Sequence, residues 1–189
     1  LVSGNLGVGS STPSFPLTIN GAVYSSTGWT GNSSLYATIP VPNGDDDILF
    51  WDPTKGALWA TERTSATSST NIGSASVAFG VDTAAYGYGA FAVGNANLAR
   101  GDYSFSGGGN SDAVGTHAFA YGNNVSANGN DTTVIGGINN NAGGIYSVIV
   151  GGRDNTTVLE AGTVIGGEFN TAGGSQSLVW GNSAETGSA

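Results

Sequence analysis

Small and large side chains alternate in short runs that recur along residues 73–181. Each run ends at a glycine, with Ser, Ala or later Val at one set of positions and Phe, Val, Tyr, Leu or Trp at the other. Clear examples are Ser76-Val77-Ala78-Phe79, Ala90-Phe91-Ala92-Val93, Ala118-Phe119-Ala120-Tyr121 and Ser177-Leu178-Val179-Trp180. Because successive side chains of a strand point to opposite faces, each run predicts a strand with one small-residue face and one large-residue face.

Glycines repeat with the same period. One set advances by 14 residues up to Gly136 and by 15 afterwards: Gly80, Gly94, Gly108, Gly122, Gly136, Gly151, Gly166 and Gly181. A second set lies half a repeat later, at Gly87, Gly101, Gly115, Gly129 and Gly143. A short fixed period with glycine at turns is typical of a solenoid. We therefore predict an all-β solenoid with coils of 14–15 residues.

The small residues are expected to face the inside of the coil. A coil of 14 residues holds two strands of about five residues and two tight turns, which leaves no room inside for aromatic rings. The opposite strand repeats a small residue as well, at Ala85, Ala99, Ala113, Ala127, Ala142 and Ala172. The alternative, in which the large residues fill the core of a single chain, is disfavoured by this narrow cross-section.

The large residues then form an apolar stripe on the outside. A stripe of this size usually marks an interface, and each large side chain that is buried contributes about 1.5–3 kcal/mol. We therefore predict an obligate oligomer. The residues expected between its chains are Val77, Phe79, Phe91, Val93, Phe105, Phe119, Tyr121, Ile135, Val148, Val150, Ile165, Leu178 and Trp180.

The 15-residue coils carry the pattern Gly-Gly-x-x-Asn, with Asn140, Asn155 and Asn170 in register. The extra residue is expected in the turn. Asparagine tolerates left-handed backbone angles and can bond both its own backbone and the next copy, so we predict a structural Asn ladder. A ligand-binding role for this ladder is the alternative.

The runs SVAFG, AFAVG, AFAYG, TVIGG and SVIVGG resemble the head repeat of YadA-like trimeric autotransporter adhesins, over about 109 residues. This resemblance implies a left-handed parallel β-roll and a homotrimer in which three rolls pack through their large residues. Coils of 15 residues depart from the usual length. The roll is expected to widen there, where Val134, Ile149, Val164 and Val179 replace inward Ala or Ser.

Residues 1–22 resemble a segment of bacteriophage tail fibres and related bacterial surface fibres, through Gly4-Asn5-Leu6-Gly7-Val8-Gly9, Pro13 and Leu17-Thr18-Ile19-Asn20-Gly21. The resemblance implies a short trimeric shaft. A tail-fibre-like shaft joined to an adhesin-like head is also similar to the mosaic adhesive trimers of predatory bacteria. The chain begins within this pattern, so we expect it to be part of a longer protein.

Residues 23–72 break the repeat and hold three of the four tryptophans. Strands are predicted at 35–39 and 48–51, followed by a turn at 52–56 and a return strand at 57–61 that completes a hairpin. We expect a small β collar here, a Ser/Thr linker at 64–70, the roll at 73–181 and a frayed tail at 182–189.

Composition narrows the possible partners. The chain has 189 residues, a net charge of −9, only four Lys and Arg residues and no cysteine. Nucleic acid is an improbable partner, because binding phosphates requires clustered cations. No apolar run approaches the roughly 20 residues of a membrane helix, so we expect no membrane insertion by this segment.

Catalytic and metal chemistry find little support in the sequence. The acids of the roll fall mostly one per coil, without the carboxylate pair of a glycosidase, and no nucleophile turn accompanies His117. We expect no enzyme activity, no cofactor and no metal. Asp45-Asp46-Asp47 is interpreted as a solvated hairpin turn, with a hard-cation site as the alternative. His117, the only histidine, is expected at a coil corner; a three-fold metal site in a trimer is its alternative.

Binding by an exposed surface is the remaining function. Candidate ligand-binding residues on the solvent side and corners of about three coils are Tyr86, Tyr88, Arg100, Tyr103 and His117, although each could be an ordinary exposed residue. We predict a trimeric adhesin or fibre segment outside the cell or on a particle surface. It would attach to a cell-surface glycan or envelope receptor by multivalent binding. A structural spacer is the alternative, and an ice- or mineral-binding solenoid is disfavoured because regular Thr-x-Thr ladders are absent.

Overall fold

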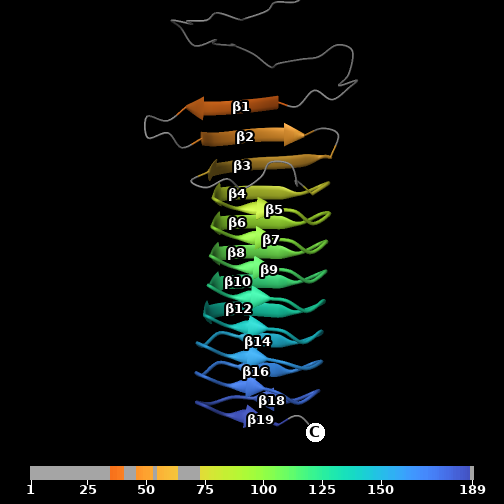
Figure 1. Cartoon of the computed structure of the whole chain (residues 1–189), viewed down its shortest axis with the longest axis vertical. Coiled ribbons are helices and arrows are strands. Elements are labelled where there is room, and N and C mark those ends of the chain that lie inside the picture. Colours follow the sequence, from red (N-terminus) through yellow and green to blue (C-terminus); the bar gives the residue numbers. More distant parts are fainter. Residues whose placement is uncertain (1–34, 41–45, 53–54, 64–72, 188–189) are drawn as a thin grey trace, which may run out of the picture. The chain divides into compact units, whose positions relative to one another are not determined.

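A computed structural model describes residues 35–40, 46–52, 55–63 and 73–187 of the chain. The shaft expected at 1–22 and the linker expected at 64–70 lie outside these residues. The described part contains strands, turns and loops and no helix, which confirms the all-β prediction (Figure 1).

One long sheet runs the length of the described chain. Its eleven strands follow each other in chain order. They are β1 (Leu35–Pro40), β2 (Asp46–Asp52), β3 (Ala57–Arg63), β4 (Val77–Val81), β6 (Phe91–Asn95), β8 (Phe105–Gly109), β10 (Phe119–Asn123), β12 (Thr133–Ile138), β14 (Val148–Val150), β16 (Thr163–Ile165) and β18 (Leu178–Val179).

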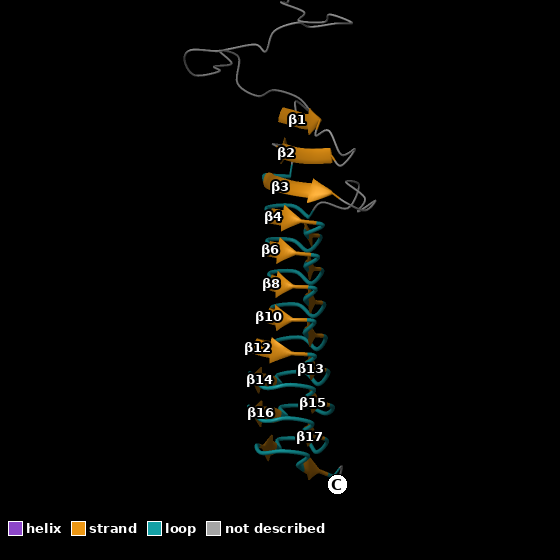
Figure 2. Cartoon of the chain, turned by 90° about the vertical axis from the view of Figure 1, so that its left-hand side faces the viewer, coloured by secondary structure: helices purple, strands orange, loops and turns teal. Residues whose placement is uncertain are grey.

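A second sheet of eight two-residue strands lies opposite the strands from β4 onward. Each of its strands follows one strand of the long sheet in the chain, so one strand from each sheet makes one coil (Figure 2). The short strands are β5 (Ala84–Ala85), β7 (Leu98–Ala99), β9 (Asp112–Ala113), β11 (Ser126–Ala127), β13 (Asn141–Ala142), β15 (Thr156–Thr157), β17 (Thr171–Ala172) and β19 (Glu185–Thr186). Pairing between coils is parallel throughout, so the predicted solenoid is confirmed as a parallel β-solenoid.

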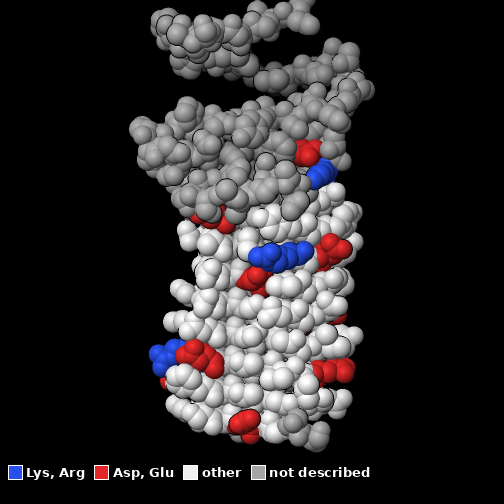
Figure 3. Space-filling view, viewed as in Figure 1, with Lys and Arg blue, Asp and Glu red and all other residues white. Residues whose placement is uncertain are grey.

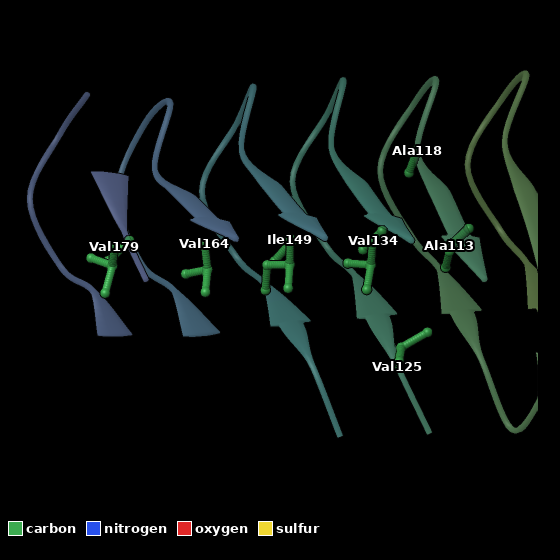
Figure 4. Packing of buried hydrophobic residues seen from close by; sticks show 11 residues of the cluster. Ala113, Ala118, Val125, Val134, Ile149, Val164 and Val179 are labelled. Carbon is green, nitrogen blue, oxygen red and sulfur yellow. The ribbon is translucent and has the colours of Figure 1, made fainter. Parts of the chain in front are cut away.

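The small residues face inward, as the alternation predicts. Ala78, Ala92, Ser106 and Ala120 are fully buried in the 14-residue coils. In the longer coils Val134, Ile149 and Val164 take the same position, also fully buried, and Val179 follows in the last coil (Figure 4). The interior therefore accommodates larger side chains where the coil gains one residue, as predicted.

The added residue is a glycine in the turn after the long strand. Tyr121 pairs with Ile135, but Asn123 pairs with Ile138, so one residue is inserted between these two rungs. Because of this insertion, the prediction that Gly143 continues the second glycine set is wrong. Gly129 lies against Gly144 instead, because every later position is displaced by one, and a Cβ atom on Gly129 would overlap the Gly144 backbone.

Two corners connect the strands of each coil, and both contain a left-handed residue. The first corner follows the long strand and has positive φ at Asp82, Ala96, Asn110, Asn124, Asn139, Asp154, Phe169 and Ser183. The second corner follows the short strand and has positive φ at Ala75, Gly89, Tyr103, His117, Asp131, Tyr146, Ala161 and Gln176. His117 therefore lies at a coil corner, as expected.

The strands before the roll continue its long sheet. β1, β2 and β3 are antiparallel, which confirms the predicted hairpin, and β3 then pairs in parallel with β4. The turn interpretation of Asp46 and Asp47 is wrong, since both residues belong to β2; Asp45 lies outside the described residues.

Trp59 of β3 covers the first coil. Its ring is buried, its Nε1–H donates to Ser76 Oγ at 3.1 Å, and it packs in one cluster with Ala78 and Ala84. At the other end, β19 pairs with β17, so the roll reaches into the segment expected to be a frayed tail.

Candidate functional site

The largest candidate site is the outward side of the long sheet from β4 to β18, which we call the outer face. Two side-chain columns run along it, one coil per step. The first column is Val77, Phe91, Phe105, Phe119, Thr133, Val148, Thr163 and Leu178. The second is Phe79, Val93, Gly107, Tyr121, Ile135, Val150 and Ile165, followed by Trp180 in the last coil.

Aromatic rings stack along the first half of the outer face. The rings of Phe91 and Phe105 are parallel to within 4° with centroids 5.5 Å apart, and those of Phe105 and Phe119 to within 9° at 4.7 Å. Phe79 meets Phe91 edge to face at 6.3 Å. Offset stacking of this kind adds about 0.5–1.5 kcal/mol per pair beyond area burial. The strand repeat therefore produces a continuous column of stacked phenylalanine rings.

The second half of the outer face carries Thr, Val, Ile and Leu side chains, with Trp180 in the last coil, and the large side chains of its second column are exposed. Exposure is 48% for Ile135, 53% for Ile165 and 69% for Trp180. Neither column contains a charged residue. All the side chains expected at a chain interface lie on this face, and none of them is buried in the single chain.

The five candidate ligand residues fall into three separate settings. Tyr88, Tyr103 and His117 form one column at the second corner. The Tyr88 and Tyr103 rings meet edge to face at 5.4 Å, and the Tyr103 and His117 rings stack at 5.4 Å. His117 Nδ1 lies 3.0 Å from Asp131 Oδ1. Because Tyr103 and His117 turn ring faces toward each other, their exposed edges and polar atoms are what remains for a ligand.

Arg100 lies on the outward side of the short-strand sheet. Its Nε–H is 3.0 Å from both carboxylate oxygens of Asp112, the partner in the next coil. Burial raises the pKa of the Asp112 carboxyl above its ordinary value, although the charge and hydrogen bond of Arg100 act in the opposite direction. The Arg100 guanidinium, which has five N–H donors, thus uses its Nε–H within the chain.

Tyr86 is the fifth candidate, and its ring packs against Trp59 of β3. Its ring centroid is 6.4 Å from that of Trp59, and the side chain is half-buried. This contact gives Tyr86 a structural role at the first coil. Tyr86 follows Ala85 and Arg100 follows its partner Ala99, so these two residues take equivalent positions in neighbouring coils.

The buried Asn ladder is present and is more extensive than the sequence analysis predicted. The side chains of Asn140, Asn155 and Asn170 are buried, and each accepts a backbone N–H from the next coil at 3.0 Å. Asn97 occupies the same position in an earlier coil and accepts from Ser111 N–H at 2.9 Å. The left-handed residue is the one before each Asn, so the expectation that these Asn residues carry that angle is wrong.

A second amide column, missed by the sequence analysis, lies outside at the first corner. Asn110 Nδ2–H donates to Asn124 Oδ1 at 2.7 Å, Asn124 to Asn139 at 2.8 Å, and Asn139 to Asp154 Oδ1 at 2.9 Å. All three Asn side chains are exposed. The signal that could have identified this column is the recurrence of Asn one residue before each inward position of the corner.

Among residues 35–40, 46–52, 55–63 and 73–187, no group of three or more His, Asp or Glu side chains could hold a metal ion. Within the same part of the chain, no helix has the length and apolar character needed to cross a membrane.

The sequence matches no protein-family model, and a search of curated proteins finds no relative of it. The resemblance to YadA-like heads and to tail-fibre shafts therefore remains an expectation drawn from the motifs. The fold is a parallel β-solenoid whose outer face is uncharged and mostly apolar.

Proposed function

We propose that this chain is a segment of a homotrimeric fibre that attaches to cell surfaces. In this arrangement three left-handed rolls pack side by side through their outer faces. The observation that carries the proposal is the outer face itself, two uncharged columns of mostly large side chains that one chain leaves exposed. Exposed apolar patches of such extent usually mark protein interfaces.

A closed three-fold arrangement fits this face better than an open one. Each chain has one continuous apolar face on the long sheet, and the outward side of the short-strand sheet is largely polar, with Asp112, Ser126, Asn141 and Thr156 in one row. A ring of three copies covers every apolar face and leaves the polar sides in water. This resembles the packing expected for YadA-like heads, and that resemblance also supports three chains.

Attachment would then depend on multivalency. Three identical surfaces on one fibre convert individually weak contacts into tight binding, provided that the target offers several receptors within reach. We place the fibre outside the cell or on a particle surface and assign it a binding role, without catalysis. A spacer that only separates another binding tip from its anchor would share the trimer but lack the binding.

Two measurements test the proposal. Sedimentation equilibrium of the purified 189-residue protein should give three times the chain mass down to micromolar concentration. A folded monomer at that concentration contradicts the trimer. Binding of the same trimer to whole bacterial cells and to isolated envelopes then distinguishes an adhesin from a spacer. Unrelated soluble proteins serve as the control for non-specific binding. A trimer that does not bind cells or envelopes is a spacer.

A further inference from the structure

The exposed amide column at the first corner is a separate surface from the outer face. Its members, Asn110, Asn124 and Asn139, lie on successive coils and end at Asp154. Each has a left-handed backbone, which directs the side chain away from the core at the same angle in every coil. Repetition of one side chain in one conformation makes a regular, outward-facing row.

The row retains hydrogen-bonding capacity toward solvent. A side-chain amide has two N–H donors and an oxygen with two lone pairs. Asn124 uses one donor toward Asn139 and one lone pair toward Asn110. One N–H and one lone pair therefore remain, and the column fixes their direction because the amide cannot rotate without breaking both bonds. The cost of ordering these side chains is already met before a ligand binds.

Further uncharged polar groups extend this surface onto the short-strand sheet. Ser126 Oγ–H donates to Asn128 Oδ1 at 2.8 Å, and Asn128 Nδ2–H donates to Asn141 Oδ1 at 2.8 Å. Ser126 and Asn141 are each two residues after a member of the column. Figure 3 shows no charged side chain at the left edge of the middle coils, where the long strands end. Asp112, which neighbours Ser126 in the short-strand sheet, is paired with Arg100.

The spacing of the row restricts the kind of ligand. Neighbouring parallel strands lie about 4.7–4.9 Å apart, so equivalent amides recur at that interval. One sugar ring of an extended polysaccharide has nearly this length. A linear glycan laid along the solenoid axis would bring one sugar per coil to one amide, and sugar hydroxyls both donate to and accept from amides. The uncharged amides give no advantage to a sulfated or phosphorylated chain, and the Asp154 carboxylate at the end of the row is already paired with Arg153.

We propose that Asn110, Asn124 and Asn139, with Ser126, Asn128 and Asn141 beside them, form a binding surface for a neutral linear polysaccharide that runs along the solenoid axis. The proposal rests on the attachment function above and names the class of its ligand and the place where it binds. It assigns recognition of the glycan to the first corner, and not to the second-corner column of Tyr88, Tyr103 and His117.

The test is binding of the intact 189-residue trimer to an array of neutral linear oligosaccharides of two, four and six sugars, with heparin fragments of matching lengths beside them. Affinity for at least one neutral series should rise between two and four sugars and then level off, because the row has three amides, and it should change little with salt. The double variant Asn124→Gly/Asn139→Gly removes two amides but keeps left-handed angles accessible. It should bind about tenfold or more weakly.

The double variant Ala161→Gly/Gln176→Gly is the matched control, since it makes the same kind of change at left-handed positions of the second corner. It should bind as the wild type does. Binding to no neutral glycan, binding to heparin alone, or undiminished binding by Asn124→Gly/Asn139→Gly overturns the inference. If the wild-type trimer attaches to cells but binds no neutral glycan, or if Asn124→Gly/Asn139→Gly still attaches to cells, the attachment function stands. Only the ligand class or the place of binding is then wrong.

Discussion

Asn155 accepts two hydrogen bonds from Asn170 in the next coil, one from its backbone N–H and one from Nδ2, both at 3.0 Å. Both side chains are fully buried. A buried donor that loses its acceptor costs far more than an average hydrogen bond contributes, so the ladder links the stability of each coil to the coil before it. This coupling is how a solenoid without disulfides and with a narrow apolar core maintains its register.

Replacing Asn155 with Ala should therefore destabilise the roll. The backbone N–H of Asn170 would lose its acceptor, and the Gly167 carbonyl would lose the donor that now lies 3.1 Å away. We expect the free energy of unfolding to fall by roughly 2–3 kcal/mol, measured by denaturant titration at one fixed protein concentration. Asn123→Ala, which alters an exposed side chain, should change it by less than about 0.5 kcal/mol. Equal effects from both variants would contradict the ladder.

The buried inward side chains are Ala or Ser in the 14-residue coils and Val or Ile in the longer coils, so substitutions that exchange these sizes should be destabilising in both halves. Ile149→Ala leaves a cavity in a wide coil and should cost about 2–5 kcal/mol. Ala92→Ile forces a branched side chain into a narrow coil, where it has no space, and should cost about 1–3 kcal/mol or more. Thermal unfolding followed by circular dichroism measures both. A tolerated Ala92→Ile variant would show that the short coils are wider than their buried Ala residues indicate.

Much of this architecture could be predicted because its constraints are steric and repeat in every coil. A narrow interior admits only small residues, so the small size of Ala78 and Ala92 predicts that they face inward. Close approach of neighbouring backbones requires glycine at positions such as Gly87. The corners were not predictable in the same way. Tyr103, Phe169 and Ala161 all adopt left-handed angles that their residue types disfavour, because the strands on either side impose the turn.

Two further features also lay beyond prediction. The displacement from Gly143 to Gly144 depends on where the added residue enters, which a fixed period does not reveal. The role of Trp59 depends on β3 pairing with β4 across a stretch of sequence without any repeat. Surface residues such as Tyr88 and Arg100 were recognisable as candidates by type, but their partners are set by the coil register.

Capping of the first coil by Trp59 leads to a third prediction. Trp59→Ala removes a buried indole over Ala78 and should lower the free energy of unfolding by about 3–5 kcal/mol. Trp59→Phe keeps most of the packing and loses only the 3.1 Å bond to Ser76, so it should cost about 1 kcal/mol from that bond and somewhat more from lost area. Equilibrium unfolding in urea gives both values. If Trp59→Phe is as harmful as Trp59→Ala, the hydrogen bond rather than the ring closes the coil.

The carboxyl of Asp112 should make stability depend on pH in an unusual direction for an acid. Its pKa in the folded chain is raised above the ordinary value of 3.8 by burial, so the folded state holds this proton more tightly than the unfolded state does. The contribution of this group to stability is then greatest at low pH and declines as pH rises through its pKa. Compared with Asp112→Asn, the wild type should lose relative stability as the pH rises from the ordinary pKa of 3.8 toward neutrality. A relative gain over that range would show that Arg100 outweighs burial.

Charge placed on the outer face should separate the proposed trimer without unfolding the roll. Ile135 and Ile165 are about half exposed in the single chain, so a lysine at either site has room in the monomer. In the trimer the same ammonium group would be buried near two copies of itself, at a cost of several kcal/mol per ion. Ile135→Lys and Ile165→Lys should therefore sediment as monomers with the wild-type β-sheet spectrum. Val158→Lys adds the same charge at a similarly exposed residue just after the short strand β15, and it should remain trimeric. Dissociation of Val158→Lys, or trimers from both isoleucine variants, would show that the copies meet elsewhere.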